Sequence, residues 1–231
     1  MANQVSDAMS GRKASTGLHP AAIGCTLFIF VAVGRLPEVL PVLAPLGLGK
    51  LAVGLAAVAL LLSGKGSEFS LFRDSLGRRM AMLGTIATIS VGYSIWGSHS
   101  LEVLVNTFAV IFVGFYLLAK SARSMKEIEL YIISLICSAG ILSYLTITEE
   151  WVGRLSSVGD TYDPNDLAMV LVTIMPLAMA RVYLGAMWTR LTFLVILVVM
   201  LLAVVLTGSR GGILGLAVVA TYFSVNQFSR A

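Results

Sequence analysis

Charged residues are scarce in this sequence of 231 residues: Asp, Glu, Lys and Arg together make up 12%, whereas 58% of the residues are hydrophobic. The mean hydropathy of +0.92 excludes an ordinary soluble domain. Cysteine is nearly absent, and Cys25 and Cys137 each fall within an apolar run, which favours buried thiols over a disulfide or a metal ligand. Residues 1–17 lack a small-residue cleavage site after a short apolar core, so they do not resemble a removable signal peptide.

Long apolar runs are abundant instead, and several reach the roughly 20 residues that a helix needs to cross a hydrocarbon core. Backbone within lipid must satisfy its own hydrogen bonds, which leaves helices or a closed barrel, and these runs lack the alternation of barrel strands. The sequence therefore predicts an all-α polytopic membrane protein, with a tail at 1–19 and a transmembrane helical domain at 20–231. About eight spans are expected, at 20–33, 51–62, 80–96, 103–118, 128–147, 166–183, 191–206 and 213–228.

Two of the segments between these spans have patterns of their own. Three prolines spaced four residues apart within 34–45 predict a kinked helix end or an interfacial hairpin, because proline removes a backbone donor. Within 64–79, Phe69, Phe72 and Leu76 fall at helical spacing opposite basic residues, which predicts a short helix on the membrane surface. Two further local expectations are a tight turn at 97–100 and a kink at Pro176.

The basic residues indicate how the spans are oriented, because cytoplasmic loops of membrane proteins are rich in Lys and Arg. With a cytoplasmic N-terminus and eight spans, 12 of the 16 Lys and Arg residues fall on the cytoplasmic side; the others are Arg35, Lys50, Arg154 and Arg210. We therefore expect both termini to be cytoplasmic. Since the basic residues sit in short loops between apolar runs, the net charge of +4 does not indicate a nucleic-acid partner.

The polar stretch before the sixth span has the pattern of a capped helix start. Asp163 suits the N-cap, Pro164 the first helical position and Asp166 the third, where a carboxylate meets the positive end of the helix. Capping explains these carboxylates better than catalysis does, and no catalytic residue is assigned. Asp160 extends the same spacing toward a hard-cation site, but carboxylates before a helix are more often solvated caps. We therefore expect no metal and no other cofactor.

Two arginines on the expected non-cytoplasmic face stand beside serine and glycine. Arg210 follows Ser209 in a polar break between two long uncharged runs, and Arg154 lies in the loop before the sixth span. One interpretation is that both arginines are anchors that reach the headgroups. The other is phosphate binding, because arginine grips phosphate oxygens bidentately and stays charged at physiological pH. The presence of both arginines on one face, with Ser209 beside Arg210, favours phosphate binding.

The same residues carry a resemblance to a known family. An Arg followed by Ser, Gly and a Pro-Asn that opens an apolar helix, and then a Thr-x-Ser-Arg-Gly between two spans, resembles the O-antigen ligase and polymerase family of bacterial envelope membrane proteins. The resemblance extends over about 80–231 and depends on two short motifs: Arg154, Gly159, Pro164 and Asn165, then Thr207, Ser209, Arg210 and Gly211.

The resemblance implies a glycosyltransferase of the bacterial inner membrane that acts in cell-surface polysaccharide biosynthesis. Such proteins transfer a glycan from a polyprenyl-pyrophosphate carrier, at the periplasmic face and without metal, to lipopolysaccharide core lipid, another glycan or a protein. Arg210 matches a family arginine that binds the pyrophosphate, and Arg154 matches the arginine of the earlier loop. The arginines would stabilise the departing pyrophosphate. The implied partners are the lipid-linked glycan and membrane lipid.

The chain departs from the family at its C-terminal side. No counterpart of the large periplasmic loop with the family's catalytic histidine, or of the later spans, is found before residue 231. His19 and His99 stand in no matching context and are expected to be interfacial. The sequence thus resembles the N-terminal part of such an enzyme: a truncated gene, a fragment, or a split enzyme whose loop is supplied by a second polypeptide. No turnover is expected of this chain alone. Two other interpretations stay open: a small transporter whose arginines line an anion path, and a non-catalytic membrane scaffold.

Overall fold

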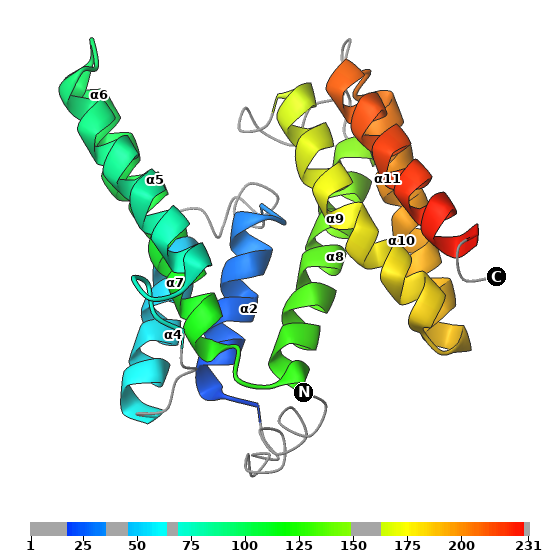
Figure 1. Ribbon diagram of the computed structural model, residues 1–231, viewed down its shortest axis with the longest axis horizontal. Helices are drawn as coiled ribbons and strands as arrows, with labels where there is room; N and C mark the ends of the chain where they lie inside the picture. The colour runs from blue at the N-terminus through cyan, green and yellow to red at the C-terminus, as the bar shows by residue number, and fades with distance from the viewer. Residues whose placement is uncertain (1–17, 36–45, 64–68, 149–162, 229–231) are drawn as a thin grey trace. The chain divides into compact units, whose positions relative to one another are not determined.

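The computed structural model describes residues 18–35, 46–63, 69–148 and 163–228. Within these ranges the chain forms helices and no strand (Figure 1). Helix α6, a π-helical segment η2 and α7 follow one another without a break, so eight continuous helices are present there. The bounds are α2 Pro20–Ala32, α4 Leu48–Ser63, α5 Ser75–Gly92, α6 Gly97–Val103, η2 Leu104–Phe108, α7 Ala109–Ser121, α8 Met125–Thr148, α9 Pro164–Leu184, α10 Met187–Leu206 and α11 Arg210–Phe228.

Four of these helices are long and apolar enough to cross a membrane: the continuous helix Gly97–Ser121, α8, α9 and α10. Three further apolar helical stretches, in α2, α4 and α11, are shorter. The all-helical class and the membrane character that the apolar runs predict are therefore confirmed. The number of eight spans and the cytoplasmic position of both termini stay predictions.

The chain divides into two compact units, each of which is described by itself. The first unit comprises the described parts of Met1–Cys25 and Ala52–Leu130, and it contains α5, α6, η2 and α7. The second unit comprises those of Thr26–Leu51 and Tyr131–Ala231, and it contains α9, α10, α11 and most of α8. The predicted limit between a tail and a membrane domain near residue 20 stays a prediction.

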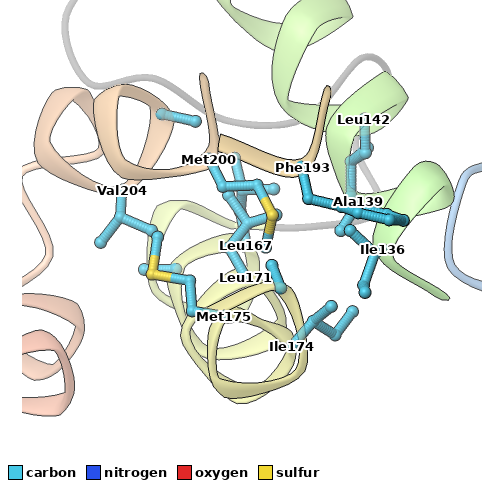
Figure 2. Close-up of a cluster of buried hydrophobic side chains, with 13 residues drawn as sticks. Ile136, Ala139, Leu142, Leu167, Leu171, Ile174, Met175, Phe193, Met200 and Val204 are labelled. Carbon is cyan, nitrogen blue, oxygen red and sulfur yellow. The ribbon is translucent and has the colours of Figure 1, made fainter. Parts of the chain in front are cut away.

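The core of the second unit lies where α8, α9 and α10 meet (Figure 2). Ile136 and Leu142 of α8, Leu167 and Leu171 of α9, and Met200 of α10 are fully buried there. The outward face of α10 carries large apolar side chains as well, so this helix is hydrophobic on all sides, as a membrane span requires.

The short surface helix predicted within 64–79 is wrong over 69–74, where turns precede α5, and residues 75–79 are helical as the first residues of α5. The backbone N–H of Ser70 donates to the Asp74 carboxylate (2.5 Å). Gly77 lies so close to the preceding turn that a Cβ would come within 2.5 Å of the Leu71 carbonyl oxygen. This hydrogen bond and this close contact hold 69–74 in a turn against the start of α5. A side-chain hydrogen bond to the backbone here replaces the helix that the apolar spacing predicts.

Other element boundaries also differ from the prediction. The tight turn predicted at 97–100 is wrong, because these residues begin α6. Helix α10 begins at Met187, ahead of the predicted start at 191. Pro176 lies inside α9, which continues as one helix on both sides of it. Most of the predicted proline hairpin, at 36–45, lies outside the described residues.

Candidate anion-binding site at the start of helices α9 and α11

Helix α9 begins with a complete N-terminal cap. Asp163 precedes the helix in an extended conformation, and its carboxylate accepts hydrogen bonds from the backbone N–H groups of Asn165 (2.7 Å) and Asp166 (2.8 Å). Pro164 occupies the first turn, where its missing N–H costs no intrahelical bond. The Asp166 carboxylate lies in the same turn, at the positive end of the helix dipole. The structure thus has the cap that these residues predict.

A tight reversal joins α10 to α11. Gly208 has a φ of 61°, a left-handed conformation that glycine adopts without steric cost. Thr207 and Ser209 on either side of it are buried, and Thr207 Oγ1 accepts a hydrogen bond from the Ser209 N–H (3.2 Å). Ser209 Oγ in turn accepts one from the Gly212 N–H (3.1 Å), as an N-cap residue does. These hydrogen bonds fix the residue at which α11 begins.

The starts of α9 and α11 lie together at one end of the second unit, at the top of Figure 1. The Ser209 hydroxyl donates a hydrogen bond to the side-chain oxygen of Asn165 (3.0 Å). The helices also approach closely, since a Cβ on Gly212 would come within 2.7 Å of the Ala168 Cβ. Two segments of the sequence that are 44 residues apart therefore meet through a direct hydrogen bond.

Arg210 is the first residue of α11, and its side chain is exposed. The positive end of the helix dipole at the start of α11 favours an anion at the same place. The Asp163 and Asp166 carboxylates at the start of α9 oppose it, although that of Asp163 is engaged in the cap. Because a diphosphate carries more than one negative charge, it is held best when a second cation joins Arg210.

The second cation predicted from the sequence, Arg154, lies outside the described residues, as do Gly159 and Asp160. Its approach to Arg210 stays a prediction. The other two predicted ligands, Arg210 and Ser209, are described, and Ser209 lies next to Asn165 of the Pro-Asn motif.

Sequence reasoning missed two features of this end of the second unit: the contact of the Asn165 side chain with α11, and the close packing at Gly212. Both depend on how distant segments pack. The close packing at Gly212 has one signal in the sequence, the pair of glycines after Arg210. The Asn165 contact has none.

A second polar cluster is buried in the first unit, around a histidine. His19 is 4% exposed, and its Nδ1 accepts a hydrogen bond from the Ala21 backbone N–H (3.2 Å). The proton is therefore on Nε2, which donates to Ser63 Oγ (3.0 Å). The Ser63 hydroxyl donates onward to the Ala59 carbonyl oxygen. With both ring nitrogens engaged, His19 caps the start of α2.

Glu127 completes this cluster and is 2% exposed. Its carboxylate accepts hydrogen bonds from the backbone N–H groups of His19 (3.1 Å), Arg123 (3.0 Å) and Ser124 (2.6 Å), and from Ser124 Oγ (2.9 Å). The Glu127 carboxylate reaches back to the Ser124 N–H, which is one half of a capping box at the start of α8, and the sequence contained the Ser-x-x-Glu signal for it. The cluster ties the starts of α2 and α8 together and serves the fold.

Comparisons of the chain with protein-family models, with curated proteins and with solved structures found no match. Over 18–35, 46–63, 69–148 and 163–228, no three His, Cys, Asp or Glu side chains gather as a metal site would require.

Proposed function

We propose that this chain is an O-antigen ligase- or polymerase-like protein that binds a polyprenyl-pyrophosphate-linked glycan at the periplasmic face of a bacterial inner membrane and takes part in its transfer. The observation that carries the proposal is the hydrogen bond from Ser209 to Asn165, beside the exposed Arg210. It joins the two motifs on which the family resemblance depends. Neither motif alone implies a contact with the other, so the hydrogen bond supports a shared role.

The proposed reaction is a displacement at the anomeric carbon of the glycan. An acceptor hydroxyl oxygen forms a bond to this carbon while the bond from the carbon to the carrier's pyrophosphate oxygen breaks. The bonding electrons leave with the pyrophosphate, and the hydroxyl proton passes to a base. Arg210 would stabilise the growing negative charge on the pyrophosphate, together with the positive end of α11. Asn165 and Ser209 would hold the start of α11 in place.

The base is not assigned to this chain. His19 has both ring nitrogens in hydrogen bonds within the first unit, and the proposal gives it no chemical role. In the proposal Arg210 and Arg154 bind and stabilise the pyrophosphate.

The test is the level of lipid-linked glycan in cells that lack this chain, complemented with variants. Loss of the chain should make the lipid-linked glycan accumulate, and the wild-type chain should reverse this. Arg210→Gln should reduce transfer by about 100-fold, the usual effect of removing a group that stabilises transition-state charge. Arg210→Lys keeps the charge but not the bidentate geometry and should restore part of the transfer.

Arg190→Gln is the matched control, because Arg190 is an exposed arginine at the other end of α10. It should behave as wild type. Unchanged lipid-linked glycan in the deleted cells would overturn the proposal. If the Arg210→Gln protein complements fully, the chain acts as a scaffold, and if deletion instead alters anion uptake into membrane vesicles, it acts as a transporter.

A further inference from the structure

The first unit holds a hollow of about 550 Å³ between the turn at 69–73 and α7. Arg73 at this hollow is exposed, and Lys120 is half-buried. Aromatic walls with cations at the rim suit an amphipathic ligand with an anionic head. The walls combine aromatic and basic side chains, among them Phe69, Phe72, Phe112, Tyr116, Arg73 and Lys120.

The turn that forms one wall of this hollow is held firmly. The ring of Phe69 packs on α7, with ring centroids 6.2 Å from Phe115 and 6.1 Å from Tyr116. At the other end of the turn, the Asp74 carboxylate accepts the hydrogen bond from the Ser70 backbone N–H (2.5 Å). Both ends are thus fixed, so the hollow is a preformed feature of the first unit.

A second hollow of about 600 Å³ lies next to the first, between α5 and the continuous helix Gly97–Ser121. Phe72 and Phe112 line both hollows, which are therefore neighbours with a shared wall. The walls of the second hollow are mostly apolar and include Ile89 and Leu104. Gly84 also lines it, and the lack of a side chain there keeps the groove open beside the Phe112 ring. A groove of this kind accommodates a hydrocarbon chain.

The charge at the head of the groove is positive. Arg78 and Arg79 are exposed at the start of α5, although neither is among the residues that line the hollows. Within the described residues 69–79 the acidic side chain is that of Asp74, whose carboxylate accepts a hydrogen bond from the Ser70 N–H. Clusters of Lys and Arg at the edge of a membrane span recognise anionic lipid headgroups.

We infer that the two hollows form one binding site for an anionic glycerophospholipid. Its phosphate contacts Arg73 and Lys120, and one acyl chain lies in the groove between α5 and α7. A soluble phosphate would leave the apolar groove unfilled, and a zwitterionic lipid would bring its own cation beside two others. The site lies within the first unit and does not depend on the proposed glycan transfer.

The test is lipid retention by the purified full chain, measured by native mass spectrometry after exchange into nanodiscs of equal parts phosphatidylglycerol and phosphatidylcholine. The wild-type chain should retain phosphatidylglycerol in preference to phosphatidylcholine. Arg73→Gln and Lys120→Gln should each weaken its retention by about fivefold, the effect of one lost contact between a basic residue and an anionic surface. Gly84→Leu, which fills the groove, should reduce the retention of both lipids.

Each variant has a matched control. Lys126→Gln removes an exposed positive charge after the end of α7 and outside the hollows, and Gly54→Leu adds the same bulk where nothing lies within 4 Å of a Cβ. Both should retain lipid as the wild type does. The inference is overturned if the two lipids are retained equally, if Lys126→Gln weakens retention as much as Arg73→Gln, or if glycerol phosphate alone displaces the bound lipid.

Discussion

At the scale of single residues, glycine sets how closely α11 approaches α9. A Cβ on Gly212 would come within 2.7 Å of the Ala168 Cβ, and one on Gly215 within 2.8 Å of Val172 Cγ1. Small residues at helix contacts in membranes let backbones approach and pack. The Ala168 Cβ cannot rotate away, so a methyl group at position 212 forces the backbones apart. The Asn165–Ser209 hydrogen bond lies at the same contact and would be stretched as well.

Gly212→Ala should therefore lower the free energy of unfolding by about 1–3 kcal/mol, the cost of overpacking a close contact. Thermal unfolding of the purified protein in detergent measures this. The control is Gly211→Ala, the same change one residue earlier, where the nearest atom to a Cβ is Ser209 Oγ at 3.9 Å. It should stay within about 0.5 kcal/mol of wild type. Equal effects of the two substitutions would show that close packing does not set the helix distance.

At the scale of elements, one carboxylate stabilises the starts of two helices. Glu127 accepts hydrogen bonds from Ser124 and Arg123 at the start of α8 and from the His19 backbone before α2. Glu127→Ala leaves these donors, among them the buried His19 N–H, without the carboxylate acceptor. It should destabilise the first unit by more than about 2 kcal/mol, since hydrogen bonds to a charged group contribute about 1.5–3 kcal/mol each.

Hydrogen exchange separates this local effect from a general one. In the Glu127→Ala protein, the first-turn amides of α2 and α8 should exchange faster, whereas those at the start of α9, which Asp163 caps, should not. The control is Glu102→Ala, which removes an exposed carboxylate from α6. Faster exchange at α9, or an equal effect of Glu102→Ala, would contradict the role given to Glu127.

How far the sequence predicts these elements depends on whether the signal is local. The apolar runs predict the helices, and Asp163 predicts the cap of α9. Both predictions succeed because each signal lies in residues that are close together in the sequence. The turn before α5 was missed because the spacing of Phe69 and Phe72 suits a helix, whereas the Phe69 ring packs on aromatic rings of α7. The Asn165–Ser209 contact had no local signal, since it arises when α11 packs on α9.

At the scale of the whole molecule, α10 separates two exposed arginines of the second unit. The helix has 20 residues, and at about 1.5 Å per residue it extends about 30 Å, the thickness of a hydrocarbon core. Arg190 lies in its first turn and Arg210 just after its end. A membrane-spanning α10 therefore puts these arginines at opposite faces, and the excess of Lys and Arg in cytoplasmic loops predicts that Arg190 is inside.

Single cysteines, in a background with Cys25→Ala and Cys137→Ala, test this orientation. An impermeant maleimide added to intact cells should label Arg210→Cys, whereas Met187→Cys, an exposed position at the start of α10, should react only after lysis. The reverse pattern would put the Arg210 end in the cytoplasm, away from any periplasmic glycan carrier, and the proposed function would fail with it. Labelling of both positions from outside would show that α10 does not span the membrane, although its length and hydropathy suit a span.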